Sequence, residues 1–120
     1  MFKKISKAVQ GLELAIYSAM VPYGEYIQMR VMADEKPYTW LVGHCTDIGY
    51  CGGLTTLALM IVSRAKGKVA LIIPTAFSGI EALTALHPKI NFDIEDVLCY
   101  YGAALFAYGV NRACNALSRR

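Results

Sequence analysis

The sequence predicts an all-α fold, an integral membrane four-helix bundle, and three observations favour this class. Apolar residues make up 56% of the chain, charged residues make up 18%, and the mean hydropathy is +0.39, a balance typical of bilayer proteins. Several stretches are long and apolar. Nine of the twelve basic residues fall in three short patches that alternate along the chain with acidic turns.

The three basic patches contain no Asp or Glu. They consist of Lys3, Lys4 and Lys7, then Arg64, Lys66 and Lys68, then Arg112, Arg119 and Arg120. The turns near 24–38 and 87–96 are rich in acids. The positive-inside rule therefore predicts a multi-pass protein of the cell (inner) membrane, with both termini and the central patch in the cytoplasm. Because the charge follows membrane sidedness, the lipid bilayer is an expected partner and nucleic acid is not.

We expect a single transmembrane domain covering 1–120, since no linker or tail is evident. A spanning helix needs about 20 mostly apolar residues. By this measure the helices are placed at about 5–23, 38–63, 69–86 and 96–113. The second is the most apolar, with Asp47 as its only formal charge. The short basic turn around Gly67 makes the second and third helices antiparallel neighbours.

The first helix is the least apolar and carries a polar stripe. The stripe follows steps of four, three and four residues, and consists of Ser6, Gln10, Glu13 and Tyr17. It either faces the bundle interior or marks a helix lying in the interface, and we favour a crossing helix because the next acidic loop then lies outside. Pro22 and Gly24 are predicted to end the helix. Glu13 and the lack of an A-x-A site argue against a cleaved signal peptide.

Small residues predict where helices approach each other closely. Gly49 and Gly53 form a small-xxx-small pair, and Gly102 lies in the last helix next to a second pair, Ala103 and Ala107. Such positions favour helix packing in membranes. Residues 24–38 are predicted to form a loop or short interfacial helix, with an aromatic belt of Tyr23, Tyr26, Tyr38 and Trp40. The four cysteines have no zinc-like or CxxC spacing, so we expect no disulfide framework.

Acids inside a bilayer cost roughly 2.5–3.5 kcal/mol on insertion scales and are therefore functional candidates. Asp47 and Glu81 are expected roughly 13 Å and 8 Å below the same outer boundary, where they can face each other. His44 shares a helix face with Asp47. The catalytic candidates are Glu81, Asp96, Asp47 and His44. Asp93, His87 and Tyr100 are candidates to line a ligand pocket at the same edge.

The chemistry of this group is open. Facing carboxylates would share a proton, pair with His44 or hold a cation. A general acid and base pair is one use. Oxygen ligands with a histidine could also suit a divalent metal, although we expect no cofactor and no metal. The chain has no GxSxG, HExxH or phosphate-binding glycine loop, which disfavours the enzymes that carry these motifs, and the sequence does not decide whether the protein is an enzyme.

Simpler structural roles account for the same residues. Asp93 fits an N-cap, with Asp96 as the acid at the third helical position. Asp47 and Glu81 also fit interhelical hydrogen bonding, and His44 fits a packing histidine.

The stretch from Glu81 to Gly109 resembles the closing signature of VanZ-like membrane proteins. The matching residues are Glu81, Pro88, Phe92, Asp93, Asp96, Gly102 and Gly109, and upstream His44 and Tyr50 resemble the membrane-embedded histidine region of the family. The chain departs from the pattern in having Thr84 for Gln, Lys89 for Arg and Tyr100 for Asn. The resemblance implies a small polytopic envelope protein, in a family associated with tolerance of glycopeptide antibiotics.

Two functions of different classes follow. The first is an outward-facing polar pocket that binds or acts on an envelope or lipid-linked ligand. The second is a non-catalytic structural or accessory subunit of a larger membrane assembly, such as a respiratory complex or a virion membrane, with other membrane subunits or copies of the chain as partners. A proton- or cation-conducting oligomer is a third and weaker hypothesis, because the chain shows no broken-helix repeat.

Overall fold

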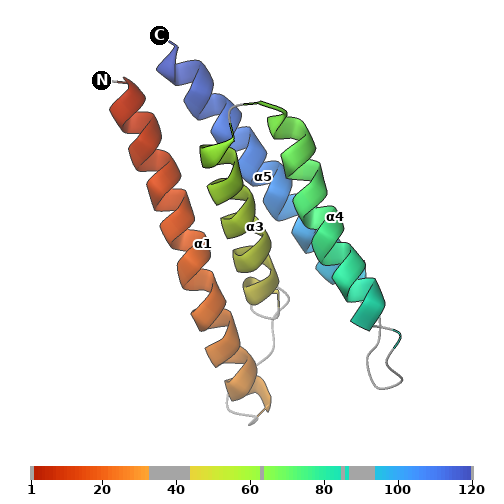
Figure 1. Ribbon diagram of the computed structural model, residues 1–120. Coiled ribbons are helices and arrows are strands. Elements are labelled where there is room, and N and C mark those ends of the chain that lie inside the picture. The colour runs from red at the N-terminus through yellow and green to blue at the C-terminus, as the bar shows by residue number, and fades with distance from the viewer. Residues whose placement is uncertain (1, 33–43, 63, 85, 87–93, 120) are drawn as a thin grey trace.

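The computed structural model describes residues 2–32, 44–62, 64–84, 86 and 94–119, and within these ranges it is entirely helical with no strand. The described residues form four helices: α1 (Phe2–Met32), α3 (Cys45–Ile61), α4 (Lys66–Thr84) and α5 (Ile94–Ser118) (Figure 1). The predicted all-α helical bundle is confirmed. The segment 38–43, expected as the start of the second helix, lies outside the described residues.

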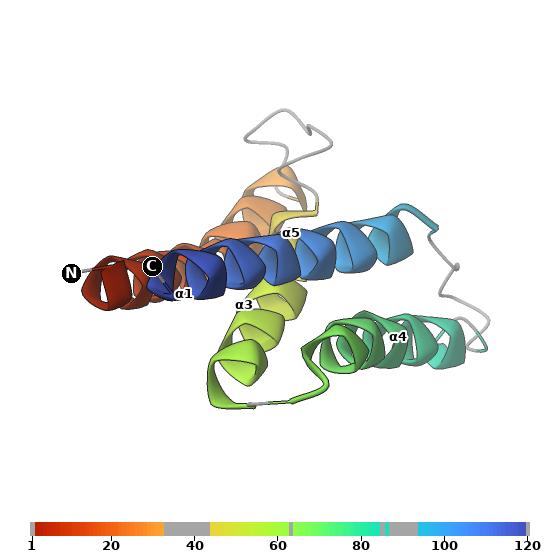
Figure 2. The same ribbon diagram turned by 90° about the horizontal axis from the view of Figure 1, so that it is seen from above.

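The helices run antiparallel in chain order, and α3 and α5 form the centre of the bundle. Helix α1 packs against both of them on one side, and α4 packs against both on the other, as the view from above shows (Figure 2). Both termini and the connection between α3 and α4 lie at one end of the bundle (Figure 1). The three basic patches therefore share that end, which we call the basic end.

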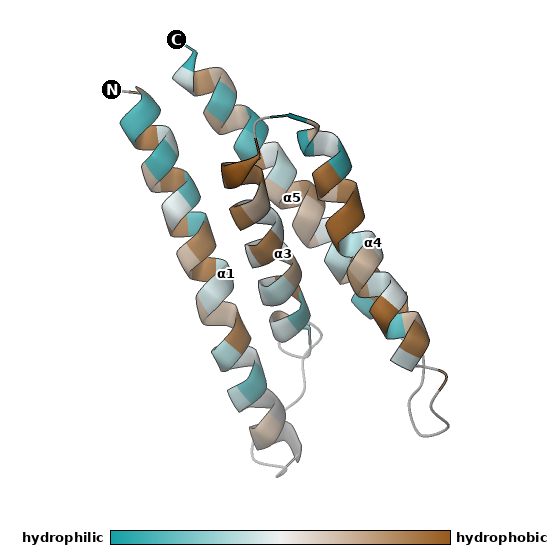
Figure 3. Ribbon diagram, in the orientation of Figure 1, coloured by the Kyte–Doolittle hydropathy of each residue, from teal (hydrophilic) through white to brown (hydrophobic). Residues whose placement is uncertain are grey.

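The bundle buries many small and polar side chains, and although Leu59 is fully buried, many other large apolar side chains are exposed. Thr55, Thr56 and Asn111 are buried, whereas Leu71 and Leu105 are 61% and 71% exposed. Hydrophilic residues gather where α1 begins and α5 ends (Figure 3). The inside of this bundle is therefore held by close contact and hydrogen bonds more than by large apolar side chains.

No helix in the described part of the chain is both long enough and apolar enough to qualify as a membrane span.

The predicted end of the first helix is wrong. Helix α1 continues through Pro22 and Gly24 to Met32, so Tyr23 and Tyr26 are exposed residues of the helix and not of a loop. A proline inside a helix loses one backbone hydrogen bond, a cost that does not end the helix where a neighbouring helix supports it. Helix α3 supplies that support, and Gly24 lets it approach closely. A Cβ at position 24 would overlap Thr46 of α3 and lie 2.6 Å from the Thr46 backbone nitrogen.

Glycines bring α3 against α1. A Cβ on Gly49 would lie 2.8 Å from the Tyr17 carbonyl oxygen, and one on Gly53 would lie 3.3 Å from the Tyr17 Cβ. Gly49 and Gly53 therefore lie where α3 approaches α1 closely. Gly52, which the sequence did not single out, would carry its Cβ into the Tyr17 ring. Gly102 is exposed, and no described neighbour lies within 4 Å of its Cβ position, so its packing role stays a prediction.

The polar stripe of α1 faces the bundle interior, as one of the two expectations had it. Ser6, Glu13 and Tyr17 are buried and Gln10 is half-buried. Ser6 Oγ donates a hydrogen bond to the Cys114 carbonyl oxygen at 2.8 Å, and Thr56 Oγ1 donates to Glu13 Oε1 at 3.1 Å. The stripe thus ties α1 to both central helices. All four cysteines are buried free thiols.

Candidate functional site

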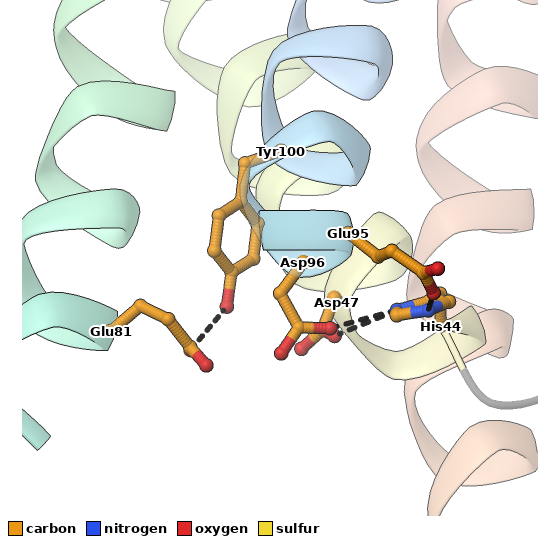
Figure 4. Close-up of polar contacts among 6 residues, drawn as sticks. All are labelled: His44, Asp47, Glu81, Glu95, Asp96 and Tyr100. Carbon is orange, nitrogen blue, oxygen red and sulfur yellow. Dashed lines mark hydrogen bonds and ion pairs between the residues drawn. The ribbon is translucent and has the colours of Figure 1, made fainter. Parts of the chain in front are cut away.

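Polar side chains from three helices meet at the end of the bundle opposite the basic end. We call this group the histidine–carboxylate cluster, and its members are His44, Asp47, Glu81, Glu95, Asp96 and Tyr100 (Figure 4). It forms where α3 and α5 begin and α4 approaches its end. Acids in the first turn of a helix are stabilised by the positive end of the helix dipole, which accounts for Asp47, Glu95 and Asp96 at these positions.

His44 is the centre of the cluster. Its Nδ1 lies 2.7 Å from Asp96 Oδ1 and 3.7 Å from Asp47 Oδ2, and its Nε2 lies 3.2 Å from Glu95 Oε2. The His44 side chain is 3% exposed, whereas those of Asp96 and Glu95 are 18% and 53% exposed. Accessibility therefore rises from the covered imidazole to a carboxylate that reaches the surface.

The surroundings of His44 favour its charged form. His44 immediately precedes the first residue of α3. Burial of the imidazole lowers its pKa, but the hydrogen bond to Glu95, the charge of Asp96 and the hydrogen bond to it, and the charge of Asp47 outweigh burial and raise the pKa of His44 above its ordinary value. A carboxylate faces each ring nitrogen, and an imidazolium has a proton on both nitrogens to match this arrangement.

Tyr100 joins Glu81 to the rest of the cluster. Tyr100 is buried on α5, and its hydroxyl donates a hydrogen bond to Glu81 Oε2 at 3.3 Å across the contact with α4. Its ring lies 5.3 Å from that of Phe77, centroid to centroid. Asp47 and Asp96 also act electrostatically on the Tyr100 hydroxyl. Tyr100 is therefore near all three of these carboxylates.

Five sequence-predicted site residues come together in the structure, namely His44, Asp47, Glu81, Asp96 and Tyr100. The expected sharing of a helix face by His44 and Asp47 is confirmed by their 3.7 Å contact. Glu81 meets the Tyr100 hydroxyl, and Asp47 meets His44. The other two predicted pocket residues, His87 and Asp93, lie outside the described residues.

Sequence reasoning missed the role of Glu95. Glu95 belongs to the acid-rich stretch near 87–96 and was not among the predicted site residues, yet it hydrogen-bonds to His44 Nε2. The available signal was its place beside Asp96 in the first turn of α5, from which two successive acids can reach opposite sides of one group. The pairing of Glu13 with Thr56 was also missed, because Glu13 lies far from the cluster and a partner on another helix leaves no local pattern.

The cluster has two chemical capabilities. A histidine paired with carboxylates can accept and return a proton as a general base and acid. His44, Asp47 and Asp96 also offer ligand atoms that all lie within 4.8 Å of one another, and imidazole nitrogen with carboxylate oxygen suits divalent metals such as zinc. The sequence-based expectation of no metal stays a prediction.

Comparisons with protein-family models, with curated proteins and with solved structures found no match to this chain. The resemblance to VanZ-like proteins therefore depends on the residues quoted above, of which His44, Glu81 and Asp96 lie in the cluster.

Proposed function

We propose that this chain is a membrane-embedded helical bundle, similar to VanZ-like envelope proteins, whose histidine–carboxylate cluster binds or acts on an envelope or lipid-linked ligand. The observation that carries the proposal is the convergence of a buried histidine with carboxylates from α3, α4 and α5 at one end of the bundle. The elements that supply these groups are far apart in the sequence.

The distribution of side chains supports the membrane part of the proposal. In water the largest apolar side chains are driven inside, but here Leu12, Ile72 and Phe106 are each more than 60% exposed while Ser6 and Thr55 are buried. In lipid the outward faces can be apolar, and helices associate through small and polar residues. The glycine contacts between α1 and α3 have this character.

The charge pattern supports a membrane orientation with the cluster on the outside. The basic patches share one end of the bundle and the cluster occupies the other. Under the positive-inside rule the basic end is cytoplasmic. The cluster would then face the compartment in which envelope ligands are assembled.

The composition of the cluster narrows the ligand chemistry. Three carboxylates surround the imidazole of His44, and a fourth, that of Glu81, contacts Tyr100, so the cluster has an excess of negative charge even with His44 protonated. A cationic or hydrogen-bond-donating group fits such a site better than a phosphate, because carboxylates accept hydrogen bonds and repel anions. An amine-bearing head group of an envelope or lipid-linked molecule is the class we favour.

The test uses growth in the presence of a glycopeptide antibiotic. The full chain, or its double variant Glu81→Gln, Asp96→Asn, is expressed in a sensitive bacterial host. The antibiotic concentration that inhibits growth is then compared between the two strains and the host alone. We expect the wild-type chain to raise the inhibitory concentration and the double variant to abolish the increase. Glu13→Gln is the matched control, because Glu13 is a buried acid that lies outside the cluster.

Membrane abundance of each variant is measured by detergent extraction and immunoblotting. A double variant as protective as the wild type at equal abundance would show that the cluster is not the functional site. If Glu13→Gln also failed to raise the inhibitory concentration, the loss would reflect bundle stability and not the cluster. A wild-type chain that leaves tolerance unchanged would contradict the envelope function itself.

A second candidate function is supported by the apolar outer surface of α4. This helix buries only Pro74 among its described side chains, and Leu71, Ile72 and Leu83 are more than 60% exposed. Such a face also suits packing against another membrane subunit, as in an accessory role. Purification in mild detergent separates the two functions, because a stable lone chain would count against the accessory role.

A further inference from the structure

A second hollow region lies at the basic end of the bundle, between α4 and α5 and remote from the histidine–carboxylate cluster. It includes an apolar groove of about 600 Å³ whose walls are formed mainly by Leu71, Tyr101, Leu105 and Tyr108. The groove begins beside Gly67 and Lys68 in the first turn of α4, whereas Glu81 lies near the other end of the same helix. The two sites are therefore separate.

A polar hollow of about 280 Å³ adjoins this groove. Its walls include Lys66, Arg112 and Arg119, together with Asn111. Tyr108 lines both the hollow and the groove, so the two regions meet at its ring. An elongated ligand can thus place a polar head in one region and an apolar chain in the other.

The positive charge of the polar hollow is held in place before any ligand binds. Lys66 Nζ donates a hydrogen bond to Asn111 Oδ1 at 3.3 Å, and Asn115 Nδ2 donates to the same oxygen at 3.1 Å. The Arg112 guanidinium lies 5.9 Å from the centroid of the Tyr108 ring, a cation–π distance. Among the described residues that line the hollow and the groove there is no Asp or Glu.

The chemistry of the lining selects an anion. The ammonium of Lys66 has three N–H donors, and one of them is used by Asn111. The guanidinium of Arg112 has five. Both groups bind phosphate well, arginine in a forked geometry. Lys66 is also the first residue of α4, where the helix dipole adds positive potential.

We propose that this composite site binds an anionic phospholipid, with the phosphate between Lys66 and Arg112 and one acyl chain along the Leu71 and Leu105 groove. A small soluble anion would leave the groove empty, and a zwitterionic lipid would bring a second positive charge, its ammonium group, next to the cationic pair. Basic pockets between helices on the cytoplasmic side are suited to anionic head groups. The inference rests on the proposed membrane placement, but not on any role of the histidine–carboxylate cluster.

The test measures lipid binding to the full chain purified in detergent. Native mass spectrometry counts bound phosphatidylglycerol and phosphatidylcholine of the same acyl composition. We expect the wild type to bind phosphatidylglycerol at least about five-fold more tightly, because Lys66 and Arg112 repel the choline ammonium of phosphatidylcholine. The double variant Lys66→Gln, Arg112→Gln should lose this preference.

Matched controls separate a built site from general attraction. Lys3→Gln, Lys4→Gln removes the same charge from exposed positions at the same end and should keep the preference. Leu105→Ser should weaken binding, whereas Phe106→Ser, an equally exposed apolar residue outside the groove, should not. Circular dichroism establishes whether each variant is folded. If the glutamine double variant unfolds, Lys66→Arg still tests the site, because it keeps the positive charge and should bind phosphatidylglycerol as the wild type does.

Several outcomes would overturn the proposal. Equal binding of the two lipids would remove the anionic preference, and an equal loss in the Lys3 and Lys4 variant would reduce it to unspecific attraction. If soluble glycerol phosphate displaced phosphatidylglycerol completely, the apolar groove would have no role in binding. If a helix of another protein co-purified in the groove, that helix and not a lipid would be the occupant. If lipid binding failed while antibiotic tolerance was kept, only the phospholipid site would be overturned. If the cluster variants lost tolerance, the phospholipid site would be unaffected.

Discussion

The two faces of α3 hold their neighbours by different interactions. Toward α1, glycines let the backbone of α3 reach Tyr17, so the contact is mainly steric, with a buried hydrogen bond from Thr56 to Glu13 beside it. Toward α5, polar groups make the connection: Cys51 Sγ donates to the Tyr100 carbonyl oxygen at 3.2 Å, and His44 meets Glu95 and Asp96. The first face is suited to rigid attachment. The second depends on protonation and is where a ligand can compete for the same groups.

The largest effect is expected from crowding the α1 face. In Gly52→Val the new Cβ would overlap the Tyr17 ring, with Tyr17 Cδ1 at 2.6 Å. We expect the free energy of unfolding to fall by about 3 kcal/mol, because overpacked cores must shift backbone or adopt poor rotamers. Thermal unfolding in detergent, followed by circular dichroism, measures the change.

Gly79→Ala is the control for this variant, because no described atom lies within 4 Å of its Cβ position on α4. It should stabilise by about 0.5–1 kcal/mol through better helix propensity. Equal destabilisation by both variants would show that α3 does not approach α1 as closely as the structure indicates.

A smaller effect is expected from the polar contact on the α1 face. Thr56→Val removes the hydrogen bond to Glu13 Oε1 and leaves that buried acid without it. The expected loss of unfolding free energy is about 1–3 kcal/mol, the cost of an unsatisfied buried polar group. Thr75→Val removes an exposed hydrogen bond, between Thr75 Oγ1 and the Tyr101 hydroxyl at 2.8 Å, and because this position is not buried it should change stability by no more than about 0.5 kcal/mol. Similar values for the two variants would refute a buried role for Glu13.

The smallest effect is expected from His44 on the α5 face, because the attraction of its carboxylates is offset by the cost of burying the imidazole. The pKa of His44 is raised from 6.5 in the folded chain. The folded state thus holds the proton more strongly, so the stabilisation is fully present below about pH 6.5 and is lost as the pH rises through the folded pKa.

Thermal unfolding of the wild type and of His44→Gln from about pH 5.5 to about pH 9 covers the range in which a histidine titrates. The stability difference between the two chains should shrink as the pH rises. A difference that grows with pH would mean that His44 is held neutral, and the charged arrangement with Glu95 and Asp96 would then be wrong.

Local sequence patterns predicted those parts of the fold that depend on a single helix. The spacing of Ser6, Glu13 and Tyr17 identified the buried face of α1, and the spacing of His44 and Asp47 placed both on one face. These predictions succeed because the helix repeat fixes which residues share a side. The predicted stop at Pro22 failed for the opposite reason, since whether a helix continues past a proline depends on what packs against it.

Partners on different helices could not be read from the chain. Nothing in the sequence around Glu95 indicates a histidine more than fifty positions earlier, and nothing around Glu13 indicates Thr56. Gly102 and Gly52 show the same limit, because both are glycines within a helix and only the neighbouring helix decides which one is covered.

The sequence by itself determined the all-α class, the antiparallel order of the helices and the separation of the basic patches from the acids of the cluster. These follow from composition, periodicity and the order of charges along the chain. The tertiary structure alone decided that Glu95 and Asp96 flank His44, that Tyr100 reaches Glu81 and that Tyr108 joins a basic hollow to an apolar groove. The physical reason is that these contacts depend on the rotation and separation of packed helices, which are set by side chains on both partners together.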